Sequence, residues 1–187
     1  VMEPVDGGVT RQQSVLFGLE SLDGASPETV LIHDGARPFV DAAVISRTLA
    51  ALERSPGAIP AMPVRDTLKK EQSGFVIETV DRQGLWRAQT PQGFRFADIL
   101  AAHRRFAGGE LTDDSAVAER AGLAVSVVDG AEDNLKITTE DDLRRAERMI
   151  GGGSSVRTGF GFDVHRFGPG DRVRLCGVDV PFDHGLV

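Results

Sequence analysis

The stretch TVLIHDGARP, residues 29–38, joins a short apolar, β-branched run to a polar loop. The run Thr29–Ile32 predicts a buried strand, and Asp41 is placed to cap an amphipathic helix that ends near Gly57. A strand, a loop and a helix in this order form the unit from which parallel α/β sheets are built. This stretch therefore sets the expected fold class.

The same alternation continues in both directions along the chain. Helices are expected near Thr10, over 97–106, after Thr112 or Asp113, and after the capping-box sequence that starts at Thr139; strands are expected over 58–64 and 124–128. We expect an α/β fold with a doubly wound, mostly parallel, Rossmann-like sheet.

One segment breaks this rhythm. Residues 67–80 alternate with a period of two around Gln72-Ser73-Gly74, which predicts a protruding β-hairpin arm. An arm of this kind often packs on a partner subunit, so the pattern favours a homo-oligomer.

The run GGGSS at residues 151–155 holds no preferred backbone conformation and predicts a linker. We therefore expect one domain over 1–150 and the start of a second α/β domain over 156–187. Because the chain begins without an initiator methionine and stops at Val187, both ends are expected to be truncations.

The composition narrows the function classes. The chain has 187 residues and a net charge of -7 from 28 acidic and 21 basic side chains, which disfavours nucleic-acid binding. Cys176 is the single cysteine, and no stretch of the sequence approaches the length of a membrane span or resembles an export signal. A cytoplasmic protein without membrane segments is expected.

Polar side chains follow the predicted strands, where α/β sheets bind ligands. In HDGARP, Asp34 can hold a metal ion or a ribose hydroxyl, Gly35 and Ala36 permit close backbone approach, and Arg37 offers a fork for phosphate. The alternative is that Asp34 and Arg37 pair across a turn.

Four further clusters share this character. They are centred on Thr67 in PVRDT, Arg82 at the base of the arm, Thr112 at a helix start, and Lys136 in a predicted apolar strand. Taken alone, a turn is the favoured interpretation of the first and a solvated arginine that of the second, and an ordinary helix cap explains the third equally well. A buried Lys136 needs an anionic partner such as a substrate phosphate.

These clusters include no Ser-His-Asp or Cys-His set. They suit phosphoryl or nucleotidyl transfer, in which a phosphate oxygen attacks the nucleotide and a divalent ion bridges the phosphates.

Taken in order, the motifs resemble those of the 2-C-methyl-D-erythritol 4-phosphate cytidylyltransferase family. The matching residues are Gly7-Gly8 with Arg11 and Ser14, then HDGARP, PVRDT, VDR-x-GLW-x-A-x-TPQ, TDDS and DN-x-K-x-T. The resemblance implies a nucleotidyltransferase that uses CTP, methylerythritol phosphate and Mg²⁺.

The resemblance also implies roles for single residues. Gly8 and Ser14 would lie near the cytosine, Asp34 would lie near the ribose and the metal, and Arg11, Gly35 and Ala36 would also bind substrate. Arg37, Thr67, Thr90, Thr112 and Lys136 would surround the erythritol phosphate. Arg37, Lys136 and Arg82 are the expected catalytic residues, with Arg82 reaching from the arm into the neighbouring subunit of a dimer.

Two departures from the family pattern stand out. Gly35 replaces the alanine of many relatives, and the family's glycine-rich nucleotide loop is expected to precede Val1. The 187-residue fragment is therefore expected to be poorly active or inactive.

The segment from Gly159 to Phe167 resembles the opening of 2-C-methyl-D-erythritol 2,4-cyclodiphosphate synthases, as does LCGV at 175–178. Asp163 and His165 lie at i and i+2, where both can meet one metal ion. The resemblance implies Zn²⁺ at these residues, a third ligand beyond Val187, and a trimeric cyclase.

The sequence as a whole thus predicts a bifunctional enzyme of non-mevalonate isoprenoid biosynthesis. A sugar-phosphate nucleotidyltransferase of the same architecture and a non-catalytic dimerising module are the alternatives.

Overall fold

The structure, a computed structural model, describes residues 3–151, 167–175, 178–181 and 184–186. The chain divides into two compact units, Val1–Glu147 and Arg148–Val187. Most of the linker expected at 151–155 lies outside the described residues, so the domain boundaries remain predictions.

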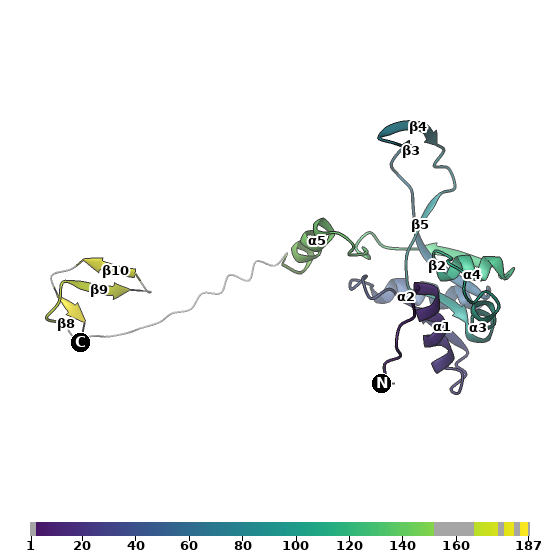
Figure 1. Cartoon of the computed structure of the whole chain (residues 1–187), viewed down its shortest axis with the longest axis horizontal. Helices are drawn as coiled ribbons and strands as arrows, with labels where there is room; N and C mark the ends of the chain where they lie inside the picture. Colours follow the sequence, from purple (N-terminus) through teal and green to yellow (C-terminus); the bar gives the residue numbers. More distant parts are fainter. Residues whose placement is uncertain (1–2, 152–166, 176–177, 182–183, 187) are drawn as a thin grey trace. The chain divides into compact units, whose positions relative to one another are not determined.

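Five strands form the main sheet of the first unit (Figure 1): β1 (Thr29–Ile32), β2 (Gly57–Pro63), β5 (Trp86–Ala88), β6 (Gln92–Arg95) and β7 (Val125–Asp129). β7 pairs in parallel with β2, whereas β6 lies between β1 and β2 and is antiparallel to both. β5 also runs against β2. Three of the five strands therefore share one direction, and the predicted α/β fold is confirmed.

Helices cover both faces of this sheet. They are α1 (Arg11–Ser21), α2 (Ala42–Leu52), α3 (Phe96–Arg105) and α4 (Asp114–Arg120). Phe94 of β6 packs with residues of α1, α3 and α4, whereas the neighbouring Gly93 faces α2, where an added Cβ would lie 2.9 Å from Thr48 Cγ2. Successive residues of a strand point to opposite faces, so β6 holds a helix layer on each side.

The helix starts follow from local hydrogen bonds. Thr10 and Asp41 accept from the N–H groups of Gln13 and Val44, as the capping patterns predict. Of the two caps expected for α4, Asp113 is the one used. In α5 (Glu140–Gly151), Thr139 and Asp142 bond to each other's N–H groups, which confirms the capping box.

The hairpin arm is also confirmed. β3 (Leu68–Gln72) and β4 (Phe75–Val80) pair only with each other and project away from the main sheet (Figure 1). Ser73 and Gly74, which connect them, both have positive φ, as tight hairpin turns require.

The described residues of the second unit include two short antiparallel pairs of strands. β9 (Arg172–Leu175) pairs with β10 (Val178–Pro181), which confirms the hairpin expected over 173–182. β8 (Phe167–Gly168) pairs with β11 (Gly185–Leu186), so the loop expected from residue 166 to residue 171 contains a short strand. The strand expected over 156–160 lies outside the described residues.

Two sequence expectations in the first unit need correction. Residues 133–138, expected to form an apolar strand that buries Lys136, form no regular element, and the side chain of Lys136 is 42% exposed. Ile137 instead donates its N–H to the carbonyl of Ala36. No strand was expected over residues 92–95, where Gly93 has low strand propensity. These residues form β6 because they fill the slot between β1 and β2, where Gln92, Gly93 and Phe94 are buried and Arg95 is exposed.

Candidate functional site

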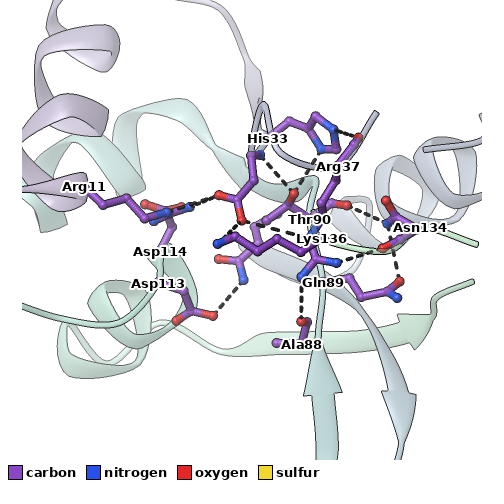
Figure 2. A network of polar contacts seen from close by, with 12 residues as sticks. Arg11, His33, Arg37, Ala88, Gln89, Thr90, Asp113, Asp114, Asn134 and Lys136 are labelled. Carbon is purple, nitrogen blue, oxygen red and sulfur yellow. Dashed lines mark hydrogen bonds and ion pairs between the residues drawn. The ribbon is translucent and has the colours of Figure 1, made fainter. Parts of the chain in front are cut away.

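Segments far apart in the sequence meet where β1 ends (Figure 2). The HDGARP loop follows β1, Gln89-Thr90-Pro91 separates β5 from β6, and residues 131–138 lie between β7 and α5. Arg11, the first residue of α1, reaches the same place. The ends of strands and the start of a helix thus build one polar cluster, as expected for an α/β sheet.

Asp34 lies at the centre of this cluster and has 13% of its side chain exposed. Its Oδ1 is 3.2 Å from Nη2 of Arg11, and its Oδ2 is 2.9 Å from Nζ of Lys136. Nε of Arg37 is 3.9 Å from Oδ2. Three cations thus surround one carboxylate, and the immediate surroundings are positive.

These neighbours shift the ionisation of the cluster. Burial alone would raise the pKa of Asp34, but the hydrogen bond from Lys136 and the charge of Arg11 outweigh burial and lower it. For Arg11, burial acts to lower the pKa, and the bonds to Asp114 and Asp34 raise it overall. For Arg37, burial lowers the pKa, and the charge of Asp34 opposes this only in part. Asp34, Arg11 and Arg37 therefore carry their charges at neutral pH.

Backbone carbonyls, rather than the carboxylate of Asp34, accept the hydrogen bonds that hold Arg37. Its Nη1 donates to the carbonyl of Asn134 at 2.7 Å, and its own N–H donates to the carbonyl of Asp34 across a turn. Its Nε is buried and has no hydrogen-bond partner. Since an unpaired buried donor is costly, this N–H is suited to a ligand oxygen.

The hydroxyl of Thr90 holds the HDGARP loop in place. It accepts the N–H of Asp34 at 3.0 Å and lies 3.0 Å from Nδ1 of His33, whose Nε2 is 2.9 Å from the carbonyl of Arg37. A carbonyl only accepts, so Nε2 carries a proton. In the tautomer that has its proton on Nε2 alone, Nδ1 accepts the hydroxyl of Thr90, whose proton then points to His33.

A cavity of about 120 Å³ opens beside Asp34. Its walls are Arg11, Asp34, Arg37, Ala88, Gln89, Thr90, Gln92, Thr112, Asp113 and Lys136. A second cavity of about 260 Å³ shares Arg37, Ala88, Gln89 and Lys136 with the first and adds Arg87 and Arg145. Cationic side chains outnumber acidic ones around both, so each favours an anionic ligand.

The structure brings together six of the residues predicted from sequence: Arg11, Asp34, Arg37, Thr90, Thr112 and Lys136 all line the smaller cavity. Other predicted residues lie elsewhere. Gly8 donates its N–H to Ser14 Oγ at the start of α1, and neither residue lines either cavity beside Asp34, nor do Gly35 and Ala36.

Thr67 and Arg82 lie exposed at the two ends of the arm and do not line these cavities. Their predicted roles at the acceptor phosphate stay predictions. Asp163 and His165 lie outside the described residues.

Several residues of the cluster received no role from sequence reasoning. Asn134 is fully buried and donates to the carbonyl of Thr90 at 2.8 Å, while Gln92 donates to Asp113 at 2.8 Å. Asp114 is fully buried behind Arg11. Each belongs to a quoted motif, but contacts between segments distant in the sequence leave no local signal.

The model of the family IspD, 2-C-methyl-D-erythritol 4-phosphate cytidylyltransferase, matches residues 2–151. The chain belongs to this family. Its IspD segment contains the whole Asp34 cluster.

Relatives and solved structures agree with this assignment. The chain is 60% identical to the bifunctional enzyme IspD/IspF of Paramagnetospirillum magneticum and 62% identical to that of Rhodospirillum rubrum, in each case over 100% of the chain and 49% of the relative. It spans about half the length of these curated relatives.

Among solved structures, the cytidylyltransferase of Thermus thermophilus superposes with a TM-score of 0.73 at 38% identity, covering 80% of this chain and 77% of that one. The bifunctional IspDF of Campylobacter jejuni superposes with a TM-score of 0.66 at 28% identity, covering 98% of this chain and 47% of that one.

IspD chemistry implies a divalent ion, and the cluster fits one only through Asp34. No group of three or more His, Cys, Asp or Glu side chains within the described ranges could hold a metal. Mg²⁺ takes most of its ligands from phosphates and water, so one carboxylate suffices for an ion that arrives with a nucleotide.

No helix in the described part of this IspD chain is long and apolar enough to cross a membrane.

Proposed function

We propose that this chain carries the acceptor-binding part of an enzyme that transfers a cytidylyl group from CTP to 2-C-methyl-D-erythritol 4-phosphate and releases pyrophosphate. Membership of the IspD family supports the reaction. The observation that carries it is the cavity beside Asp34, whose walls include the cationic side chains of Arg37 and Lys136, which suit a phosphate.

The residues of the Asp34 cluster suit this reaction because it requires no nucleophile from the protein. A phosphate oxygen of the acceptor attacks the α-phosphorus of CTP, a new P–O bond forms, and the bond to the β-phosphate breaks. The attacking phosphate is already ionised, so no general base is required. Arg37 and Lys136 would orient the acceptor and stabilise the charge that builds up in the transition state.

The hydroxyl of Thr90 plays a supporting part in this proposal. Its proton is directed to His33, so it would hold the loop of Asp34 and Arg37 rather than donate to the acceptor. Mg²⁺, held by Asp34 and the triphosphate, would neutralise phosphate charge when bound.

A homodimer built through the β3–β4 arm is part of the proposal. Phe75, Val76 and Ile77 on this arm are 75%, 65% and 52% exposed, and an apolar edge of this kind is suited to a partner surface. The partner's arm would bring a second copy of Thr67 and Arg82 to the acceptor phosphate.

The relatives' bifunctional names support a fused cyclase that acts after a separate kinase has added a phosphate to the cytidylylated product. The added phosphate would attack the β-phosphate, which closes the 2-C-methyl-D-erythritol 2,4-cyclodiphosphate ring and releases CMP. We also propose, from the sequence resemblance, that Asp163 and His165 bind Zn²⁺ and that the cyclase is a trimer.

A cytoplasmic location is proposed from the single cysteine. The 187-residue chain alone is proposed to be poorly active.

The test is pyrophosphate release by the full-length gene product with CTP and Mg²⁺. Methylerythritol phosphate should support turnover, and hexose 1-phosphates should not. Arg37→Gln should abolish most of the rate, while Arg104→Gln, which removes an exposed arginine paired with Glu20 and Asp23, should keep it.

Turnover with a hexose 1-phosphate instead would favour the sugar-phosphate nucleotidyltransferase. Failure to bind either CTP or methylerythritol phosphate in calorimetry would favour the non-catalytic dimerising module.

A further inference from the structure

Arg11 bridges two carboxylates that face it from different elements. Its Nη2 is 2.8 Å from Oδ2 of Asp114 in α4 and 3.2 Å from Oδ1 of Asp34 after β1 (Figure 2). Its Nε also donates to Asp34, at 3.2 Å. With both of these nitrogens engaged by carboxylates, the guanidinium is anchored to the protein on this side.

Asp114 is the buried end of this bridge. Its side chain is fully buried and does not line the cavity beside Asp34, so no ligand there can touch it. Its second oxygen, Oδ1, lies 3.2 Å from Nε2 of His103, which is also fully buried, although the geometry is not that of a hydrogen bond. A buried carboxylate requires a cation beside it, and Arg11 supplies that charge.

The two oxygens of Asp34 have different cationic partners. Arg11 donates to Oδ1, and Lys136 pairs with Oδ2. While Arg11 stays fixed on Oδ1, Lys136 can leave Oδ2 for a phosphate without stranding the charge of Asp34. If Arg11 were free to move, Asp34 would retain Lys136 for itself.

We propose that Asp114 is a positioning residue that fixes Arg11 on Asp34 and thereby releases Lys136 to bind the phosphate of the acceptor. Asp114 acts through two intervening side chains and makes no contact with substrate. This inference rests on the proposed function for the identity of the acceptor, but its geometry does not depend on turnover.

The key variant is Asp114→Asn in the full-length gene product, since it keeps the shape and removes the charge. Simple electrostatics predicts tighter phosphate binding, because a negative charge is removed near the site. The positioning role predicts the opposite sign: the affinities for methylerythritol phosphate and for inorganic phosphate should fall about fivefold. Loss of stability changes an apparent affinity only through the folded fraction, so both affinities are measured at a temperature where wild type and variant are fully folded.

The matched control is Val117→Ala, which removes buried apolar atoms from the same helix without touching Arg11. It should lower the melting temperature and leave both affinities unchanged. A side-chain NMR signal gives a second measure: the Nε–H resonance of Arg11, identified by its loss in Arg11→Lys, should exchange faster with water in Asp114→Asn.

Unchanged or tighter phosphate binding in Asp114→Asn, or an equal loss in Val117→Ala, would overturn the positioning role and leave the proposed function intact. Conversely, a wild-type protein that binds phosphate but transfers no cytidylyl group would overturn the proposed function. The positioning role would then be decided by phosphate binding and the Arg11 signal.

Discussion

The Asp34 cluster and the β3–β4 arm both contain lysine–carboxylate pairs, yet the two pairs differ in their surroundings. Lys136 and Asp34 approach to 2.9 Å, and the carboxylate is 13% exposed. Lys70 and Glu78 on the arm are 3.6 Å apart, and 62% and 58% of their side chains are exposed. Solvent screens the second pair far more than the first.

The comparison teaches that charge alone does not identify a site in this chain. The cluster is linked to three backbone segments through Thr90, Asn134 and Arg37, so its side chains keep one arrangement. The strands of the arm, β3 and β4, form a separate two-stranded sheet. A fixed cluster can discriminate ligands by geometry, whereas the arm is suited to a surface that covers it.

The largest expected effect separates the two lysines directly. Lys136→Ala should lower kcat/KM for cytidylyl transfer by about 10²–10³-fold, because it removes a preorganised cation from the reacting phosphates. Lys70→Ala should leave kcat/KM within about twofold. Steady-state kinetics of the full-length gene product measures both, and equal losses would remove the distinction between cluster and arm.

A smaller effect is expected at Thr90. Thr90→Val keeps the shape but removes the hydroxyl that accepts the N–H of Asp34, and kcat should fall about tenfold with little change in the KM for the acceptor. Thr90→Ser should restore most of the rate. A large rise in KM with unchanged kcat would instead mean that Thr90 contacts the acceptor itself.

Acid should weaken the cluster in a defined direction. The pKa of Asp34 is lowered by folding, so its stabilising contribution is complete above the ordinary aspartate pKa of about 3.9 and is lost as the pH falls through the lowered value. The difference in unfolding free energy between wild type and Asp34→Asn should therefore be largest near neutral pH and shrink below about pH 4. Urea titrations at several pH values measure it, and a constant difference would contradict the role of these ion pairs.

Asp142 offers a check outside the cluster. Hydrogen bonds from Thr138 and Thr139 lower its pKa to about 2. The helix start that it caps should therefore remain intact down to about pH 2, and Asp142→Ala should reduce helix content at about pH 7 in circular dichroism. Equal helix content in variant and wild type would show that this cap is dispensable.

The smallest expected effect on folding lies on the arm. Phe75→Ser should change the unfolding free energy of a monomer by less than about 0.5 kcal/mol, because the ring is 75% exposed. It should nevertheless weaken self-association in sedimentation velocity if the arm forms the dimer. Glu53→Gln, on the exposed end of α2, serves as the control for a surface change away from the arm.

Local chemistry explains what the sequence by itself determined. The helix caps at Thr10 and Asp41, the capping box before α5, and the turn at Ser73 and Gly74 depend on bonds between residues close together in the chain. Both partners of each such bond lie within one short motif, so the helices, the arm and the α/β class could be predicted. The order of the motifs also indicated the family.

The tertiary structure decided how the motifs share their charges. Sequence reasoning placed Lys136 in a strand and assigned Arg11 to the substrate, whereas Lys136 lies in an irregular segment and Arg11 bridges residues 23 and 103 positions away. The partner of a charged side chain is fixed by which elements pack together and by the cost of burying an unpaired charge. Neither quantity is local, so the pairing of Asp114 with Arg11 became visible only in the folded chain.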